Sequence, residues 1–259
     1  MYAVDLNSDM GESFGVYKMG DDAAMLRIVS SANVACGFHA GDPLVMAETV
    51  EQARANGVDV GAHPGFMDLW GFGRRTIQGE RPQDIEKILI YQIGALQAMA
   101  LAHGHRVTHV KTHGALGNMA FVDRALSDAI VRAIKAVDPA LVLVTSPNNE
   151  TENAAQAGGL RIAREIFADR GYGDNGLLLP RKEPGAMIHD PQEAAERIVR
   201  MIQERAITSV NGKKFAARID TICVHGDSAH AVAMAAAVRA ALEREGIAIR
   251  PISQLDLSD

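Results

Sequence analysis

Ionisable and amide side chains follow short apolar runs at several places in this 259-residue chain. Carboxylate, imidazole, ammonium and guanidinium groups are the ones that transfer protons, bind anions and hold metal ions. If the apolar runs are parallel strands, their carboxyl ends meet at one end of the sheet, so these groups share a pocket there. The candidate residues are Asp5, Asn7, Asp9, Glu12, His39, His63, Lys111, His113, Glu165, Asp169, Arg170, His225 and Asp227.

The first cluster crowds the end of the first apolar run. Strand alternation places Asp5, Asn7 and Asp9 on one side, with Glu12 shortly after them. Carboxylates held this close repel one another, so one of them could have a raised pKa and serve as acid or base. A bound cation would relieve the same repulsion, and a capped, hydrogen-bonded loop is the structural alternative.

Two histidines end the next two runs. His39 follows a strand and precedes a helix that Asp42 caps, where backbone N–H groups favour anions. His63 repeats this arrangement in Gly-Ala-His-Pro-Gly. A single histidine is often structural, but two at successive strand ends favour a functional site that titrates near neutral pH.

Lys111 and His113 end the fourth run and stand two residues apart, so they point the same way if the strand reaches them. His109 would share that face, deeper in the core. A buried lysine at this place would neutralise a substrate oxyanion or act as a tuned acid.

The later clusters have both functional and structural interpretations. Glu165, Asp169 and Arg170 could serve the pocket, or they could form a salt-bridge network that holds their loop. Asp227 could orient His225 or cap the helix that follows.

Arg75 lies in the glycine-rich segment Gly-Phe-Gly-Arg-Arg. It could place a guanidinium fork on a carboxylate or phosphate, or the segment could be a surface loop. The chain contains no G-x-x-x-x-G-K-[S/T] and no H-E-x-x-H motif. These absences weaken the case for a self-contained ATPase and a zincin.

Strands that alternate with helices must position these residues. Gly57 suits the C-cap of the first long helix, and Asp190-Pro191 opens a later one with a capping box. A two-residue hairpin is expected at Val210-Asn211-Gly212-Lys213. The predicted strands are Tyr2–Leu6, Ser31–Cys36, Asp59–Ala62, Val107–Val110, Leu141–Thr145, Arg161–Phe167 and Thr221–Val224, and the predicted helices Pro43–Ala55, Pro82–Ala102, Asp123–Val137, Asn149–Ala157, Asp190–Arg205 and Ala229–Glu245.

This pattern predicts an α/β fold, a single domain over residues 1–259. We expect an irregular β/α barrel of about seven parallel strands, because no G-x-G-x-x-G follows the first strand and polar residues end nearly every strand.

Composition narrows the partners and the compartment. The net charge of −6 argues against nucleic acid, whose phosphates require a basic face. Cys36 and Cys223 each end a strand-like run and are expected to be reduced core residues. No signal peptide or membrane span is indicated, so we expect a cytoplasmic protein.

Several long motifs in series resemble the LamB/YcsF family. They are Asp5-Leu-Asn-Ser-Asp-Met-Gly-Glu-Ser-Phe-Gly15, Ser31-Ala-Asn-Val-Ala-Cys-Gly-Phe-His-Ala-Gly-Asp-Pro43, Gly61-Ala-His-Pro-Gly65, Gly71-Phe-Gly-Arg-Arg75, Phe167-Ala-Asp-Arg170 and Cys223-Val-His-Gly-Asp227. The resemblance implies a barrel related to polysaccharide deacetylases. It also implies an ATP-consuming complex in which this chain acts with separate 5-oxoprolinase B and C subunits to open 5-oxo-L-proline to L-glutamate. The chain departs from the family pattern at Thr112 and Gly117, which bears on substrate preference.

In the implied reaction, one set of these residues would be catalytic and a second set would hold substrate. The catalytic set is Asp9, His39, His63, Lys111, His113, Glu165, His225 and Asp227, and the substrate-binding set is Asn7, Glu12, Arg75, Asp169 and Arg170. One alternative is a stand-alone metal-dependent amidohydrolase or deacetylase with Asp9, His39 and His63 as ligands. Another is a noncatalytic subunit that presents ligand to a partner.

Overall fold

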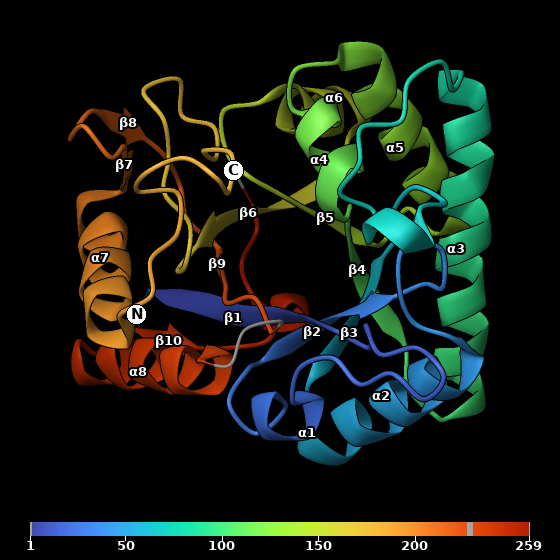
Figure 1. Cartoon of the computed structure of the whole chain (residues 1–259), viewed down its shortest axis with the longest axis horizontal. Helices are drawn as coiled ribbons and strands as arrows, with labels where there is room; N and C mark the ends of the chain where they lie inside the picture. Colours follow the sequence, from blue (N-terminus) through green and yellow to red (C-terminus); the bar gives the residue numbers. More distant parts are fainter. Residues whose placement is uncertain (1, 227–229, 259) are drawn as a thin grey trace.

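Seven parallel strands close into a barrel in the computed structural model, which describes residues 2–226 and 230–258 (Figure 1). Their spatial order is β1-β2-β3-β4-β5-β6-β9, and β9 pairs with β1 to complete the circle. The strands are β1 (Ala3–Met10), β2 (Ser31–Ala35), β3 (Asp59–His63), β4 (Val107–Lys111), β5 (Val142–Thr145), β6 (Arg161–Phe167) and β9 (Thr221–Cys223). The predicted α/β barrel of about seven strands is therefore confirmed.

Helices surround the barrel (Figure 1). The longer ones are α2 (Pro43–Asn56), α3 (Pro82–Ala102), α5 (Arg124–Val137), α6 (Glu150–Gly158), α7 (Pro191–Glu204) and α8 (Ala231–Arg244), and the short elements are α1 (Asp22–Met25), α4 (Gly114–Ala120), η1 (Leu69–Gly71) and η2 (Ile252–Gln254). The Asp42 side chain accepts hydrogen bonds from two backbone N–H groups of α2, and Asp190 does the same for α7. Both predicted N-caps are confirmed.

Four local predictions were wrong or incomplete. Strand β1 continues to Met10, because polar residues that resemble a loop point into the barrel. The hairpin of β7 (Ala206–Thr208) and β8 (Lys214–Ala216) has a wider loop than the predicted two residues, spanning 209–213. Neither α4 nor the short β10 (Ala248–Ile249), which pairs with the start of β1, was predicted.

The barrel interior is polar, and the apolar core lies between the barrel and its helices. Along β1, Val4 and Leu6 belong to the apolar core, whereas Asp5 and Asn7 bond to side chains of other strands across the barrel. The alternation of strand side chains therefore separates two buried environments of opposite polarity.

Helix α3 is long and apolar enough to cross a membrane, alone among the described helices. Its buried residues include Ile85, Leu89, Ile93 and Leu96, which recur every three or four positions. This spacing gives one apolar face, which packs against α5 and the barrel. One face of α3 is therefore buried within the fold.

Candidate active site at the carboxyl end of the barrel

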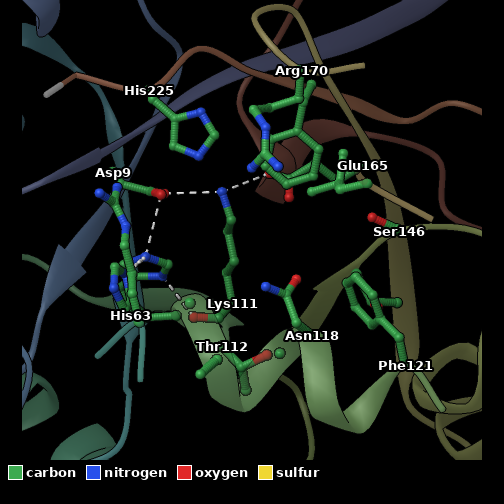
Figure 2. A pocket seen from close by; sticks show the side chains of 18 of the residues that line it. Asp9, His63, Lys111, Thr112, Asn118, Phe121, Ser146, Glu165, Arg170 and His225 are labelled. Carbon is green, nitrogen blue, oxygen red and sulfur yellow. Dashed lines mark hydrogen bonds and ion pairs between the residues drawn. The ribbon is translucent and has the colours of Figure 1, made fainter. Parts of the chain in front are cut away.

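A pocket of about 430 Å³ opens at the carboxyl ends of the strands (Figure 2). Its size is typical of sites for small molecules. Acidic and basic groups line its floor, and the segment 177–181 and helix α4 line its sides. The polar lining residues are Asp9, Glu12, His63, Arg74, Lys111, Thr112, His113, Asn118, Thr145, Ser146, Glu165, Arg170, Arg181 and His225.

Lys111 joins two carboxylates on the pocket floor. Its Nζ lies 2.9 Å from Asp9 Oδ1 and 2.9 Å from Glu165 Oε1, and it also contacts Cys223 Sγ at 3.2 Å. All four side chains are buried. Burial disfavours the ammonium, yet Asp9 and then Cys223 and Glu165 raise the pKa of Lys111 well above its usual value. The lysine is therefore a fixed positive charge in the pocket.

The pKa values of the two carboxyl groups are shifted in opposite directions. Burial opposes ionisation of Asp9, but the neighbouring His63 and Lys111 hold its pKa well below the usual range. Burial dominates at Glu165 and raises its pKa even with Lys111 beside it. Neighbouring carboxyl groups whose pKa values are pushed apart can divide the roles of base and acid.

A hydrogen-bonded network below the floor fixes Asp9. Asn33 Nδ2 donates to Asp9 Oδ1 and to Asn7 Oδ1, and Asn33 Oδ1 lies 3.0 Å from His109 Nε2. A Cβ on Gly61 would lie 2.1 Å from the His109 ring, so only glycine fits beside this histidine. The network leaves Asp9 Oδ2 facing His63 at 3.3 Å.

Asp5 lies at the opposite end of this interior. Ser30 and Ser31 donate to its Oδ1 at 2.7 and 2.6 Å, and Thr221 donates to its Oδ2. Burial raises the pKa of Asp5 to about 7 in spite of these donors. Asp5 is thus part of the interior network and not of the pocket lining.

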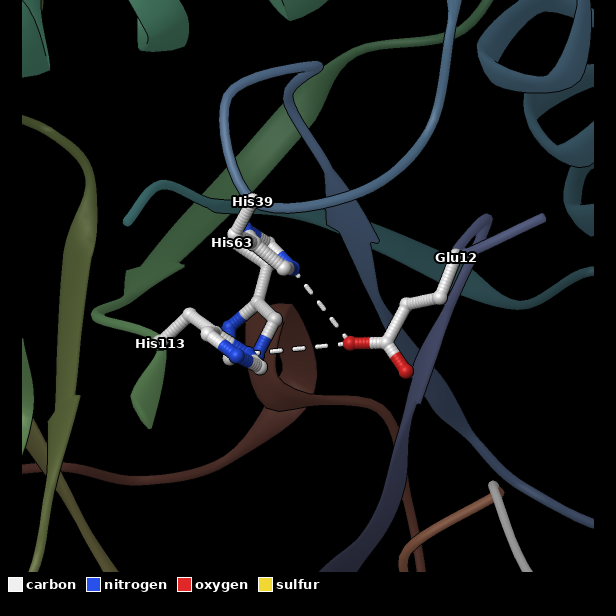
Figure 3. A group of neighbouring side chains, drawn as sticks. All are labelled: Glu12, His39, His63 and His113. Atoms are coloured by element: carbon white, nitrogen blue, oxygen red, sulfur yellow. Dashed lines mark hydrogen bonds and ion pairs between the residues drawn. The ribbon is translucent and has the colours of Figure 1, made fainter. Parts of the chain in front are cut away.

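Three histidines and Glu12 form a second group beside Asp9 (Figure 3). Glu12 Oε1 lies 3.4 Å from His39 Nε2 and 3.6 Å from His113 Nδ1, while His63 Nε2 lies 2.9 Å from His113 Nδ1. Burial and the neighbouring rings lower the pKa values of His39 and His113 well below normal. The donor types and their convergence would suit a metal ion.

His225 and Asp169 form a pair at the pocket wall. Both carboxylate oxygens of Asp169 lie 2.8 Å from His225 Nδ1, and the imidazole stacks on Phe167. Burial opposes the charge on Asp169, but His225 lowers the pKa of this carboxyl. This pairing orients the other nitrogen of His225.

Arginines add positive charge to the pocket. Arg170 donates to the carbonyl of Leu179, which ties strand β6 to the segment 177–181, and its pKa is lowered by burial and then by Arg181. The guanidinium of Arg74 lies 4.8 Å from the centre of the Phe72 ring. Arg74, Arg170 and Arg181 all line the pocket, so an anionic substrate group is favoured there.

Most of the residues predicted from sequence lie in or beside the pocket. Asn7 and His39 lie behind its lining, and Asp169 reaches it through His225. Arg75 does not line the pocket, because its side chain is 62% exposed and pairs with Asp68. Asp227 lies outside the described residues, as does the predicted helix start at Ala229.

Three residues at the site have contacts that the sequence did not predict. Cys223 is a buried, free cysteine of the core, as predicted, and its sulfur also contacts Lys111 in the pocket floor. Asn33 was not singled out, although its place two residues after Ser31 is the signal that it faces inward. Arg74 lines the pocket where Arg75 was expected, and nothing in a Gly-Arg-Arg sequence separates the two.

The chain resembles known proteins along nearly its whole length. The model of the LamB/YcsF family matches residues 4–257. A protein of Rhodopseudomonas palustris that is named as the A subunit of 5-oxoprolinase is 55% identical over 250 residues, which are 96% of this chain and 98% of that protein. The crystal structure of a lactam utilization protein from Thermus thermophilus superposes with a TM-score of 0.91 at 46% identity, covering 96% of this chain and 100% of that one.

A more distant likeness concerns the fold alone. A structure described as T48 deacetylase with substrate has a TM-score of 0.51 at 15% identity, over 98% of this chain and 89% of the other. It confirms that the barrel is of the kind found in deacetylases, as the sequence predicted. At this identity it says nothing about the reaction.

Proposed function

Because the chain belongs to the LamB/YcsF family, we propose that it is the component of a 5-oxoprolinase that opens the lactam of 5-oxo-L-proline to give L-glutamate. The observation that carries this proposal is Lys111, which is held between Asp9 and Glu165 in the floor of a small-molecule pocket. In hydrolysis of an amide, a base can activate water, a fixed cation can stabilise developing negative charge, and an acid can protonate the departing nitrogen.

The reaction adds one water across the C–N bond of the lactam. Oxygen attacks the ring carbonyl, the C–N bond breaks, and the nitrogen takes up a proton to leave as an amine. An unstrained five-membered amide resists water, so we propose that the complex uses ATP to phosphorylate the carbonyl oxygen, which releases ADP and leaves an activated imidate phosphate. Water attacks its ring carbon and the C–N bond breaks to give the γ-carboxyl phosphate of L-glutamate, and a second water then releases inorganic phosphate and L-glutamate. This chain has no nucleotide-binding P-loop. We therefore assign the phosphorylation to the B and C subunits, and the use of ATP is consistent with a cytoplasmic enzyme.

The three floor residues have distinct roles in this proposal. Asp9, the ionised carboxylate, accepts the proton of the attacking water through Oδ2, which faces His63. Lys111 stabilises the negative charge carried by the phosphorylated carbonyl oxygen and its phosphoryl group while water attacks, a contribution of roughly 3–4 kcal/mol in comparable sites. Glu165, whose pKa is raised, donates the proton that the departing nitrogen needs.

The substrate carboxylate is proposed to bind on the arginine side of the pocket. Arg170 and Arg181 line the wall next to segment 177–181, and Leu178 and Leu179 offer apolar surface to the ring methylenes. His225, oriented by Asp169, is placed to donate a hydrogen bond there. Arg75 has no part in this scheme, because its guanidinium is bound to Asp68 outside the pocket.

The test is release of glutamate from 5-oxo-L-proline and ATP by the reconstituted complex. We expect the chain to be required, and we expect Glu165→Gln to lower kcat by about 10²–10⁴-fold, as for loss of a general acid. Glu204→Gln is the matched control. Glu204 is an exposed glutamate in α7 that also pairs with a lysine, Lys214, but it does not line the pocket. Its turnover should equal that of the wild type.

The same assay separates the remaining alternatives. Unchanged turnover with Glu165→Gln and Lys111→Met, together with saturable 5-oxo-L-proline binding, would identify a noncatalytic, ligand-presenting role and contradict our proposal. Hydrolysis by the chain alone without ATP would identify a stand-alone amidohydrolase instead.

A further inference from the structure

Two of the clustered histidines have their outer nitrogens fixed by backbone carbonyls. His63 Nδ1 lies 2.8 Å from the carbonyl oxygen of Lys111, and His113 Nε2 lies 2.8 Å from that of Phe72. A carbonyl oxygen can only accept a hydrogen bond, so each of these outer nitrogens carries the proton. When each ring is neutral, its inner nitrogen therefore presents a lone pair to the cluster.

These lone pairs face each other inside the cluster. His63 Nε2 and His113 Nδ1 are 2.9 Å apart, and neither has a hydrogen to donate to the other. The carboxylate oxygen Glu12 Oε1 lies 3.6 Å from His113 Nδ1, and Asp9 Oδ2 lies 3.3 Å from His63 Nε2. Four atoms that can each offer a lone pair thus converge in a buried space, an arrangement that a positive charge among them would stabilise.

We propose that this cluster binds one divalent transition-metal ion through Glu12 Oε1 and the inner nitrogens of His39, His63 and His113 (Figure 3). The four donor atoms lie within 4.8 Å of one another. Four ligands at tetrahedral zinc lie about 3.3 Å apart, close to the separations here. Imidazole donors with one carboxylate suit zinc, cobalt, manganese or iron, and disfavour calcium and magnesium.

The outer hydrogen bonds rank the ligands. Metal-bound histidines nearly always donate their other N–H, and loss of that partner weakens metal affinity by about 10–100-fold. His63 and His113 have such partners, whereas His39 Nδ1 contacts no polar atom among the described residues. His39 stacks on His113 with ring centres 3.7 Å apart and is the weakest of the three ligands.

Packing holds the rings in place before any ion binds. Gly73 has φ of +63°, and a Cβ there would come within 2.7 Å of the His113 ring and 2.8 Å of His39 Cβ. His39, His63 and His113 are all buried. A bound ion would lie next to Asp9 at the pocket wall, where such ions polarise a carbonyl or a water molecule.

The test is titration of chelator-stripped protein with Co²⁺, followed by its visible absorption, and then displacement by Zn²⁺. We expect one Co²⁺ per chain with the intense bands of low-coordinate cobalt. His63→Gln and His113→Gln should each weaken Co²⁺ binding by at least about tenfold, and His39→Gln should weaken it less. This measurement needs neither partner subunits nor 5-oxo-L-proline, so it stands or fails independently of the proposed reaction.

His103→Gln is the matched control, because His103 Nδ1 also pairs with a glutamate, Glu51, but outside the cluster. It should bind Co²⁺ like the wild type. Thermal unfolding of each stripped variant establishes that the fold is intact. Failure of the wild type to bind Co²⁺ or Zn²⁺ would mean that a shared proton supplies the positive charge, and would overturn the inference. So would equal Co²⁺ affinity of the wild type, His63→Gln and His113→Gln.

Discussion

Lys111→Met removes the positive charge that two buried carboxyl groups share. Methionine keeps an unbranched chain of similar length, so the change is mainly electrostatic. The Lys111, Asp9 and Glu165 side chains are only 6%, 8% and 3% exposed, so water cannot replace the ammonium. Removing one partner of such a buried pair costs about 3–5 kcal/mol in free energy of unfolding.

The cost should depend on pH in a defined direction. Burial already raises the pKa of Glu165 above its unfolded value, and without Lys111 this effect of burial is less strongly opposed, so the folded pKa of Glu165 rises further. A carboxyl group with a raised folded pKa contributes stability at low pH, and that stability is lost as pH rises towards the folded pKa. If the folded variant holds one more proton than its unfolded state, the difference in free energy of unfolding between the wild type and the variant grows by about 1.4 kcal/mol per pH unit.

Urea unfolding of wild type and Lys111→Met at pH 6, 7 and 8 measures how their difference in free energy of unfolding changes with pH. We expect the stability difference to increase by up to about 3 kcal/mol across the two units. Lys87→Met, which removes an exposed ammonium near Asp84, should change stability by less than about 0.5 kcal/mol at every pH. A Lys111→Met effect below about 1 kcal/mol, or one that is constant from pH 6 to 8, would refute the assigned buried charge cluster.

Three further predictions concern residues other than Asp9, Lys111 and Glu165. Burial raises the pKa of Asp5 to about 7 in the folded protein, so the free energy of unfolding of the wild type, measured in urea, should fall by up to about 4 kcal/mol as pH rises from 4 to 7. Asp5→Asn should remove this pH-dependent loss of stability. Gly61→Ala places a methyl group against His109 and should lower stability by about 1–3 kcal/mol or more, seen as a fall in melting temperature. Arg75→Ala should leave kcat/KM for 5-oxo-L-proline within about twofold of wild type, because the Arg75 guanidinium pairs with Asp68 away from the pocket; a tenfold loss would restore the sequence-based role.

The elements were predictable because their signals are local. Asp42-Pro43 opens α2 and Gly57 closes it, and both signals depend only on backbone hydrogen bonding at the helix ends. The convergence of Asp9 and Lys111 followed from one rule, that parallel strands gather their carboxyl ends. Residues that are 102 positions apart thereby meet at 2.9 Å.

Other features depend on three-dimensional context that no local pattern contains. The polar run in β1 resembled a loop, because a strand with Asn7 and Asp9 buried is stable only when partners such as Asn33 on the adjacent strand β2 bond to it. The choice between Arg74 and Arg75 is set by the backbone after Gly73, whose φ of +63° turns the chain. The role of Cys223 depends on Lys111, 112 residues away.

The polar interior also explains how one carboxylate can serve two neighbouring groups. Asp9 Oδ1 receives hydrogen bonds from both Asn33 and Lys111, while Oδ2 faces His63. The side chain cannot rotate without breaking two buried hydrogen bonds, so its free oxygen stays directed at the histidine cluster. Burying so many polar groups inside a barrel is costly unless each is bonded, and the bonds that offset this cost also fix the geometry that the pocket needs.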